Sequence, residues 1–199
     1  MRSSILGPAT LAALVLLVAC AGRSQSTPNP PPPAASRPGP SSAPASPSPT
    51  SPTWLAVDSA ARTATLTLEV TAPPGSPSGL INRYRAGEAR IIVPLGWTVK
   101  WNWRNADSTA HSLVVMVQRE KIPLEGGRPA FSNAMTRMVA TGLPPGATDQ
   151  TSFVADEAGW YWLLCGVPNH ALLGEWLELR VDPEATSARA QIKSVNGKQ

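Results

Sequence analysis

The residues that could bind a metal ion are few enough to be considered one by one. The chain of 199 residues contains two histidines, His111 and His170, and two cysteines, Cys20 and Cys165. A thiolate and two imidazoles form the equatorial ligand set of a type 1 copper site, because soft sulfur favours Cu(I) and a nearly trigonal arrangement suits both oxidation states. His111, Cys165 and His170 are therefore the candidate ligands of one copper ion.

Cys165 begins a short loop that could carry two of these ligands. The segment 165–170 (CGVPNH) joins two expected strands, so it can return the thiol and the imidazole of His170 to one ion. If Cys20 is used for lipidation, as argued below, Cys165 has no intramolecular disulfide partner in an oxidising compartment. The alternative is a buried structural cysteine and two ordinary polar histidines. The copper interpretation uses both histidines and the spare cysteine, so we favour it.

Alternating apolar and polar residues predict the strands that would hold the ligands. Such period-two patterns or apolar runs occupy 64–70, 91–94, 97–103, 111–117, 160–165 and 177–181. In segment 111–117, His111 shares its parity with the apolar residues, so its side chain should point inward. Several short strands with frequent turn signals and no sustained helical period predict an antiparallel β-sandwich over residues 54–183.

Three motifs carry a pattern that extends beyond the ligands. They are 93–99 (VPLGWTV), Asn105 six residues before His111, and 159–174 (GWYWLLCGVPNHALLG). Together they resemble cupredoxins, and within that superfamily most closely the sulfocyanin group. The resemblance covers about residues 54–183. It implies an eight-stranded Greek-key sandwich with one copper ion for electron transfer, and it places His111, Cys165 and His170 at the ligand positions.

One position departs from the family pattern. In these proteins an axial methionine commonly lies five residues after the second histidine, and here that position is Glu175. Its parity with Leu177 and Leu179 predicts an inward side chain. Glu175 could ligate copper directly, could act as a hydrogen-bonded group behind the ligands, or could face solvent. A bound carboxylate is a hard, charged donor that favours Cu(II), so direct ligation would lower the reduction potential.

The N-terminal segment has the features of an export signal. A positive start precedes the largely apolar residues 5–18, a run that is shorter than the roughly 20 residues needed to span a bilayer. The LVAC motif that ends at Cys20 resembles a bacterial lipobox, which implies a signal peptide at 1–19 and lipidation of Cys20. We therefore expect an extracytoplasmic protein anchored by lipid to a bacterial membrane, on its periplasmic or cell-surface side. An uncleaved anchor, or a cleaved signal with an unmodified cysteine, are the alternatives.

Two segments flank the expected domain. Of the 22 prolines, 11 lie between Pro28 and Pro52, and such a composition favours extended polyproline II over a packed core. Residues 20–53 are therefore expected to form a disordered Pro/Ser-rich tether, with a Pro-rich docking motif as the minority alternative. Residues 184–199 are polar and lack aromatic residues, so they are expected to form a flexible tail.

The charge distribution argues against a nucleic-acid partner. The formal net charge is +4, but Arg2, Arg23 and Arg37 precede Trp54 and leave 14 Lys and Arg against 13 Asp and Glu in the rest of the chain. A nucleic-acid-binding domain needs basic residues gathered on one face. The nearly neutral domain is expected to have no nucleic-acid partner.

The leading functional hypothesis is an electron carrier that alternates between Cu(II) and Cu(I) and is not an enzyme. By family resemblance, electrons would pass through the partly exposed C-terminal histidine, His170. Ala171, Leu172 and Leu173 would form an apolar rim that docks a redox protein such as a cytochrome or a terminal oxidase, since redox encounters use small, short-lived contacts. Ordinary loop packing of these residues is the alternative.

Two other functions remain open at this point. A copper carrier or delivery protein is one, because the carboxylate of Glu175 would tighten Cu(II) binding. A single-copper redox enzyme is the other. Enzymes on this scaffold add a second copper site built mainly from histidine, and no histidine remains here after the first site, so catalysis would need an open position at the one copper.

Overall fold

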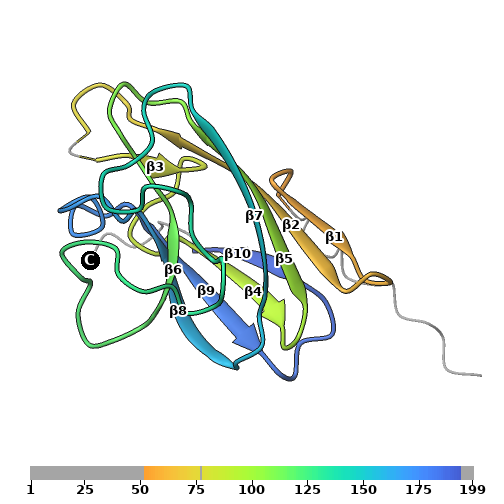
Figure 1. Cartoon of the computed structure of the whole chain (residues 1–199). Helices are drawn as coiled ribbons and strands as arrows, with labels where there is room; N and C mark the ends of the chain where they lie inside the picture. The colour runs from red at the N-terminus through yellow and green to blue at the C-terminus, as the bar shows by residue number, and fades with distance from the viewer. Residues whose placement is uncertain (1–51, 77, 194–199) are drawn as a thin grey trace, which may run out of the picture. The chain divides into compact units, whose positions relative to one another are not determined.

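Ten β-strands form two five-stranded sheets in the part of the chain that the structure describes, residues 52–76 and 78–193 (Figure 1). The structure is a computed structural model. The expected signal peptide, the lipidation site Cys20 and nearly all of the tether lie outside the described residues, as does the end of the tail. The strands belong to the unit formed by residues 46–199.

The first sheet has the order β1-β2-β5-β7, with the short β3 paired to β2. Its strands are β1 (Leu55–Asp58), β2 (Thr63–Thr71), β3 (Leu80–Ile81), β5 (Thr98–Asn105) and β7 (Thr148–Val154). The second sheet has the order β10-β4-β9-β8-β6. Its strands are β4 (Ala89–Pro94), β6 (Val114–Val117), β8 (Gly159–Leu164), β9 (Trp176–Asp182) and β10 (Arg189–Ile192).

The predicted β-sandwich is confirmed, but its sheets are mixed and not wholly antiparallel. The pairs β2–β5 and β4–β9 run parallel. Such parallel pairs are possible because the chain passes from one sheet to the other between consecutive strands. For example, β4 lies in the second sheet and the next strand, β5, lies in the first. Neighbours within a sheet are therefore often distant in sequence. The described residues contain ten strands instead of the eight that the family resemblance implied.

The core lies between the sheets and explains the alternating sequence. In β5, Val99, Trp101 and Trp103 are buried while the residues between them face solvent. Leu66 and Leu68 of the neighbouring β2 belong to the same buried cluster. Each fully buried side chain of this size contributes about 1.5–3 kcal/mol. The same core includes residues of β8 and β9, the two strands that flank the segment from Cys165 to Glu175.

Three edge strands, β1, β7 and β10, and the short β3 were missed by the sequence pattern. β7 has a mostly polar sequence and only Phe153 of its residues is buried. β10 pairs with β4 and lies within the segment 184–199 that was expected to be flexible. That expectation is wrong as far as Ile192, because β10 shares ladder hydrogen bonds with β4 and the preceding Ala188 is buried.

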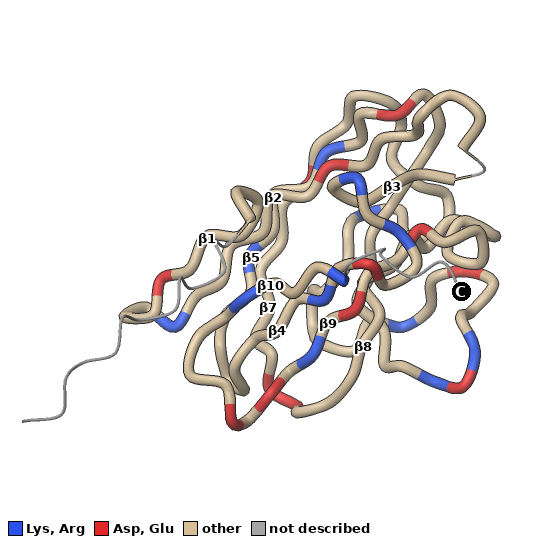
Figure 2. Tube along the Cα trace, turned by 180° about the vertical axis from the view of Figure 1, so that it is seen from behind, with Lys and Arg blue, Asp and Glu red and all other residues tan. Residues whose placement is uncertain are grey.

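Basic and acidic residues are both spread along the described trace (Figure 2). Arg90 and Lys193 both pair with Glu178, at 2.6 and 2.8 Å. The absence of a nucleic-acid partner stays a prediction. Among the residues described here, no helix has the length and apolar character that a bilayer crossing requires.

Candidate metal centre

His111 lies in the connection between β5 and β6. The predicted strand 111–117 is shorter than expected, since β6 begins at Val114. His111 instead forms an isolated bridge with Leu143, in which each backbone amide donates to the other residue's carbonyl, at 3.2 and 2.7 Å. The prediction that its side chain points inward is correct, because His111 is only 1% exposed.

The other three candidate ligands come from the loop that joins β8 to β9. Cys165 directly follows β8, and Glu175 directly precedes β9. The amide of Cys165 donates to the carbonyl of Glu175 at 3.0 Å, and the amide of Glu175 donates to the carbonyl of His170 at 3.0 Å. The loop reverses through Asn169 and Gly174, whose φ angles are 71° and 105°. Its backbone therefore brings Cys165, His170 and Glu175 together.

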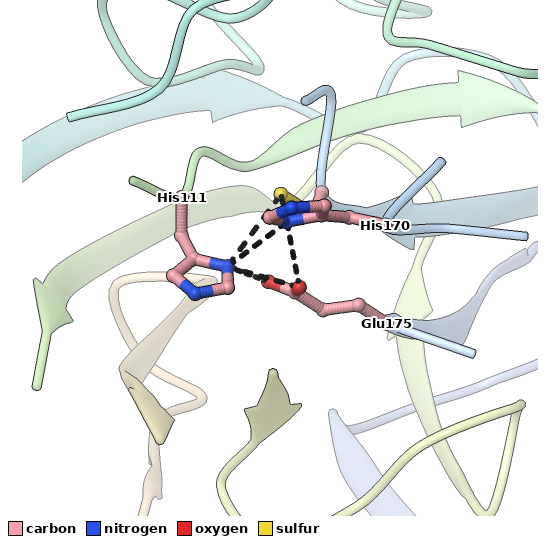
Figure 3. Close-up of side chains that lie close together, drawn as sticks. His111, His170 and Glu175 are labelled. Carbon is pink, nitrogen blue, oxygen red and sulfur yellow. Dashed lines mark hydrogen bonds and ion pairs between the residues drawn. The ribbon is translucent and has the colours of Figure 1, made fainter. Parts of the chain in front are cut away.

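Four side chains converge on one point (Figure 3). Nδ1 of His111 and Nδ1 of His170 are 3.2 Å apart. Sγ of Cys165 lies 4.0 Å from the first nitrogen and 3.5 Å from the second. The carboxylate of Glu175 lies 2.9 Å from Nδ1 of His111 and 3.3 Å from Nδ1 of His170. All four ligand atoms lie within 4.8 Å of one another.

These separations fit donors arranged around a single ion. Metal–nitrogen distances of about 2.0 Å and metal–sulfur distances of about 2.3 Å put neighbouring donors roughly 3.3–3.8 Å apart in a trigonal or tetrahedral arrangement. The three distances among His111, Cys165 and His170 are 3.2, 3.5 and 4.0 Å. Two imidazoles and one thiolate are the donor set of a mononuclear copper centre. The cluster is thus suitable for one copper ion.

The site is closed except at one imidazole. Cys165 and Glu175 have no exposed surface, and His111 is 1% exposed. The side chain of His170 is 21% exposed. It borders a cavity of about 350 Å³ that is lined mainly by residues 72–76, 78–79 and 107–109. Of the four candidate ligands, His170 is therefore the one closest to solvent.

Burial removes one of the three possibilities for Glu175. A solvent-facing side chain is excluded, because Glu175 is 0% exposed. Its Oε2 accepts a hydrogen bond from the amide of Gly79 at 3.2 Å. Both carboxylate oxygens lie 2.9 Å from Nδ1 of His111. The carboxylate thus lies where a fourth ligand, or a hydrogen-bonded neighbour of the ligands, would be.

The four groups shift one another's protonation. Burial alone would lower the pKa of His111, because it disfavours the charged imidazolium. The contacts with Cys165 and Glu175 outweigh this effect and raise the pKa of His111 to about 10. The same two partners raise the pKa of His170 to about 9. Burial alone would raise the pKa of Cys165 and of Glu175, but the histidines outweigh it and lower both pKa values. In the metal-free cluster, protons therefore occupy the nitrogens that an ion would bind.

Ser112 forms hydrogen bonds between the segment that carries His111 and the loop that carries Cys165. The sequence analysis did not identify this residue. Its hydroxyl donates to the carbonyl of Val139 at 2.6 Å and accepts from the amide of Gly166 at 2.9 Å. Its amide points at Sγ of Cys165 across 3.4 Å. The sequence signal that could have identified Ser112 is its position directly after His111, which gives it the opposite parity in the period-two pattern.

The predicted docking rim is only partly exposed. Ala171 is 1% exposed and packs with Val114, Trp162 and Leu164 in a second apolar cluster. Its inclusion in the rim was wrong, because the loop turns it into the protein. Leu172 and Leu173 are 53% and 41% exposed, so these two side chains are available to a partner.

A β-sandwich that gathers two imidazoles, a thiolate and a carboxylate where β8 and β9 are joined defines a cupredoxin-type copper protein. A family model of the sulfocyanin (SoxE) domain matches residues 50–192, and the chain belongs to that family.

The individual proteins to which the chain is similar have low sequence identity to it. Sulfocyanin of Sulfolobus acidocaldarius is 26% identical over 141 residues, which are 67% of this chain and 71% of that protein. Among solved structures, the chain is similar to auracyanin of Roseiflexus castenholzii, with 23% identity, a TM-score of 0.39, and coverage of 59% of this chain and 97% of the other. It is also similar to a rusticyanin variant, with 22% identity, a TM-score of 0.39, and coverage of 61% and 82%.

Proposed function

We propose that this protein is an electron carrier whose single copper ion is held by His111, Cys165, His170 and Glu175. The observation that carries the proposal is the convergence of four donor atoms within 4.8 Å, three of them on buried residues. When bound, copper supplies the Cu(II)/Cu(I) couple. The chain's own residues must hold the donors in one arrangement for both oxidation states and keep water away.

The surrounding hydrogen bonds suit that task. The backbone hydrogen bond between Cys165 and Glu175 fixes the two ends of the loop that carries three of the proposed ligands. The hydrogen bond between Ser112 and Gly166 joins this loop to the segment of His111. A frame that does not rearrange when the charge changes keeps the reorganisation small. This rigidity favours fast electron exchange over chemistry that needs an open coordination position.

Glu175 is proposed as the fourth ligand. Its carboxylate is buried, lies between the two histidines and accepts a hydrogen bond from a backbone amide. A buried negative charge beside the donors favours the more highly charged ion. We therefore expect a reduction potential lower than that of a site with methionine at this position.

Electrons are proposed to pass through His170. It is the ligand with an exposed edge, and the exposed Leu172 and Leu173 follow it in the same loop. These two leucines are proposed to dock a redox protein such as a cytochrome or a terminal oxidase. By the lipobox resemblance at Cys20, the protein is proposed to be lipid-anchored on the extracytoplasmic side of a bacterial membrane, with residues 20–53 as a tether.

One observation favours a second function. The carboxylate of Glu175 would hold Cu(II) tightly, as a copper carrier or delivery protein requires. The two functions differ in what leaves the site: a delivery protein gives up the ion, whereas an electron carrier keeps it through repeated oxidation and reduction.

The test is the optical and electron paramagnetic resonance spectrum of the copper-loaded protein and of Cys165→Ser. We expect an intense thiolate-to-copper absorption in the unchanged protein and its loss in the variant, with the far-ultraviolet circular dichroism preserved. An unchanged spectrum and copper content in Cys165→Ser would remove the site assignment. Loss of copper to a chelator in each redox cycle would instead favour delivery.

A further inference from the structure

His111 has a second contact that the proposed copper site does not use. Its Nε2, on the far side of the ring from the other ligands, lies 2.7 Å from Oδ2 of Asp107 and 2.9 Å from Oγ1 of Thr109. The Asp107 side chain is only 8% exposed, and His111 is 1% exposed. A nearly buried carboxylate therefore faces the back of a proposed copper ligand.

The turn that carries Asp107 is held in place by a buried residue. Asn105 ends β5 and is 0% exposed. Its Oδ1 accepts from the amide of Asp107 at 2.9 Å, while its Nδ2 donates to the carbonyls of Thr109 at 2.7 Å and Leu143 at 3.0 Å. Leu143 is also the backbone partner of His111. One buried amide thus positions the carboxylate relative to the histidine.

A hydroxyl fixes the carboxylate itself. Oγ1 of Thr109 donates to Oδ2 of Asp107 at 2.7 Å, the same oxygen that faces Nε2 of His111. An ionised carboxylate can only accept hydrogen bonds, so Nε2 is the nitrogen that carries the hydrogen in this contact. The neutral ring then has its lone pair on Nδ1, which points toward Cys165 and His170.

We propose that Asp107 is a positioning residue that fixes the tautomer of His111 and, through its negative charge, makes the site favour Cu(II) over Cu(I). Carboxylate–histidine–metal arrangements orient the ring and increase the donor strength of the nitrogen that binds the metal. A stronger donor stabilises the ion of higher charge more than the ion of lower charge. Asp107 therefore lowers the reduction potential without touching the ion. The inference rests on the proposed function, since it requires His111 to bind copper through Nδ1.

The test compares Asp107→Asn with the unchanged full chain. The substitution keeps the shape and one acceptor oxygen but removes the charge. Affinities for Cu(II) and Cu(I) are measured by competition with chelators specific for each oxidation state, and the reduction potential is measured by titration. We expect Cu(II) binding to weaken about 10- to 100-fold and Cu(I) binding to weaken less. Each tenfold change in the ratio of the two affinities raises the potential by about 59 mV.

Two further variants separate this effect from a loss of structure. Thr109→Val removes the hydroxyl that holds the carboxylate and keeps the side-chain shape, so it should move the affinity ratio in the same direction by a smaller amount. Asp156→Asn removes an exposed carboxylate from the turn between β7 and β8, at the other end of β8 from Cys165. It should leave the ratio unchanged.

The possible results are distinguishable. An unchanged affinity ratio in Asp107→Asn, or an equal loss of both affinities, overturns the proposal, because a structural role alone does not discriminate between oxidation states. If Asp107→Asn does not fold, the ratio in Thr109→Val decides. If the unchanged protein binds no copper, or if His111→Ala leaves binding unaltered, the proposed function fails instead.

Discussion

The amide of Gly79 donates a hydrogen bond to Oε2 of Glu175 across 3.2 Å, although the two residues are 96 positions apart. Glu175 is buried, so this amide replaces one of the hydrogen bonds that water would otherwise give its carboxylate. A Cβ at position 79 would lie 2.6 Å from Val70 and 2.9 Å from the carboxyl carbon of Glu175. The lack of a side chain at 79 therefore sets how the carboxylate lies beside the two histidines.

Gly79→Ala is expected to disturb the metal site as well as the fold. The added methyl group must displace either Val70 or Glu175, and overpacking of this kind costs about 1–3 kcal/mol. Denaturant unfolding measures the cost, and the spectrum of the copper-loaded protein reports the shift of Glu175. Gly127→Ala is the matched control, because its Cβ would meet only the flexible end of Met116 at 3.4 Å. Equal behaviour of the two variants would contradict the packing argument.

Metal binding to the metal-free protein should release protons. The pKa of His111 is raised to about 10 and that of His170 to about 9, so both rings carry a proton on the metal-binding side at pH 7. Metal binding must displace these protons, about two in all. Affinity for a redox-inert ion such as Zn(II) should therefore rise with pH and level off above about pH 10. Calorimetry in buffers of different ionisation enthalpy measures the release, which should fall by about one proton in His170→Ala.

The same pKa values set the direction of a stability change. Both histidines have folded-state pKa values above the ordinary value of 6.5. Their contribution to the stability of the metal-free protein is complete below about pH 6.5 and is lost as the pH rises through 9 and 10. A metal-free protein whose unfolding free energy did not decline over that range would contradict the raised pKa values.

The residues of the candidate metal centre could be identified from the sequence because their types are scarce and their positions follow strand parity. Both histidines and the single spare cysteine were accounted for from composition, and the parity of Glu175 with the core residues of β9 predicted its inward side chain. These signals hold because a strand turns alternate side chains to opposite faces. Parity gives no information about residues in loops. This is why Ala171, which lies in the loop between β8 and β9, was wrongly assigned to the surface.

The contacts behind the ligands could not be predicted in the same way. Asp107 reaches His111 only because Asn105 fixes the turn between them, and Ser112 meets Gly166 only because two distant segments cross. The edge strands β7 and β10 have polar sequences, so their assignment depends on ladder partners and not on composition. Such features depend on tertiary pairing, which a one-dimensional pattern does not contain.

Membrane attachment should depend on Cys20. Cys20→Ala should abolish lipidation, because stable attachment would come from acyl chains. The variant should appear as unprocessed precursor or as released protein when membranes are separated by centrifugation. Mass spectrometry of the mature protein should find the lipid on Cys20 and no lipid on Cys165. A mature, membrane-free protein with an unmodified Cys20 would contradict the anchoring proposal.

Docking should depend on the two exposed leucines after His170. Leu172→Asp and Leu173→Asp should slow electron exchange with a cytochrome partner roughly fivefold, the effect of about 1 kcal/mol at an interface. Their stability should change little, because both side chains are exposed. Val154→Asp is the control, since Val154 is 48% exposed at the end of β7. Equal slowing by all three variants, or slowing with a small inorganic oxidant, would place the effect elsewhere.

The fourth ligand can be tested by replacing Glu175 with donors of different charge. Glu175→Met substitutes a soft, neutral thioether, which should raise the reduction potential by about 59 mV or more, the shift that corresponds to a tenfold change in relative affinity. Glu175→Gln keeps an oxygen donor without the charge, so its potential should fall between the two. The spectrum of the unchanged protein should stay constant from neutral pH to below 4.5, because the histidines hold the pKa of Glu175 below that ordinary value.

A carboxylate that only accepts hydrogen bonds behind the ligands would give a different result. The copper would keep the same direct donors in Glu175→Gln, so the spectrum would change little while the potential still rose through the lost charge. If Glu175→Met left the spectrum, the potential and the copper affinity all unaltered, Glu175 would have neither role. The electron-transfer proposal would survive that result through His111, Cys165 and His170, but both the low potential and the copper-delivery alternative would lose their basis.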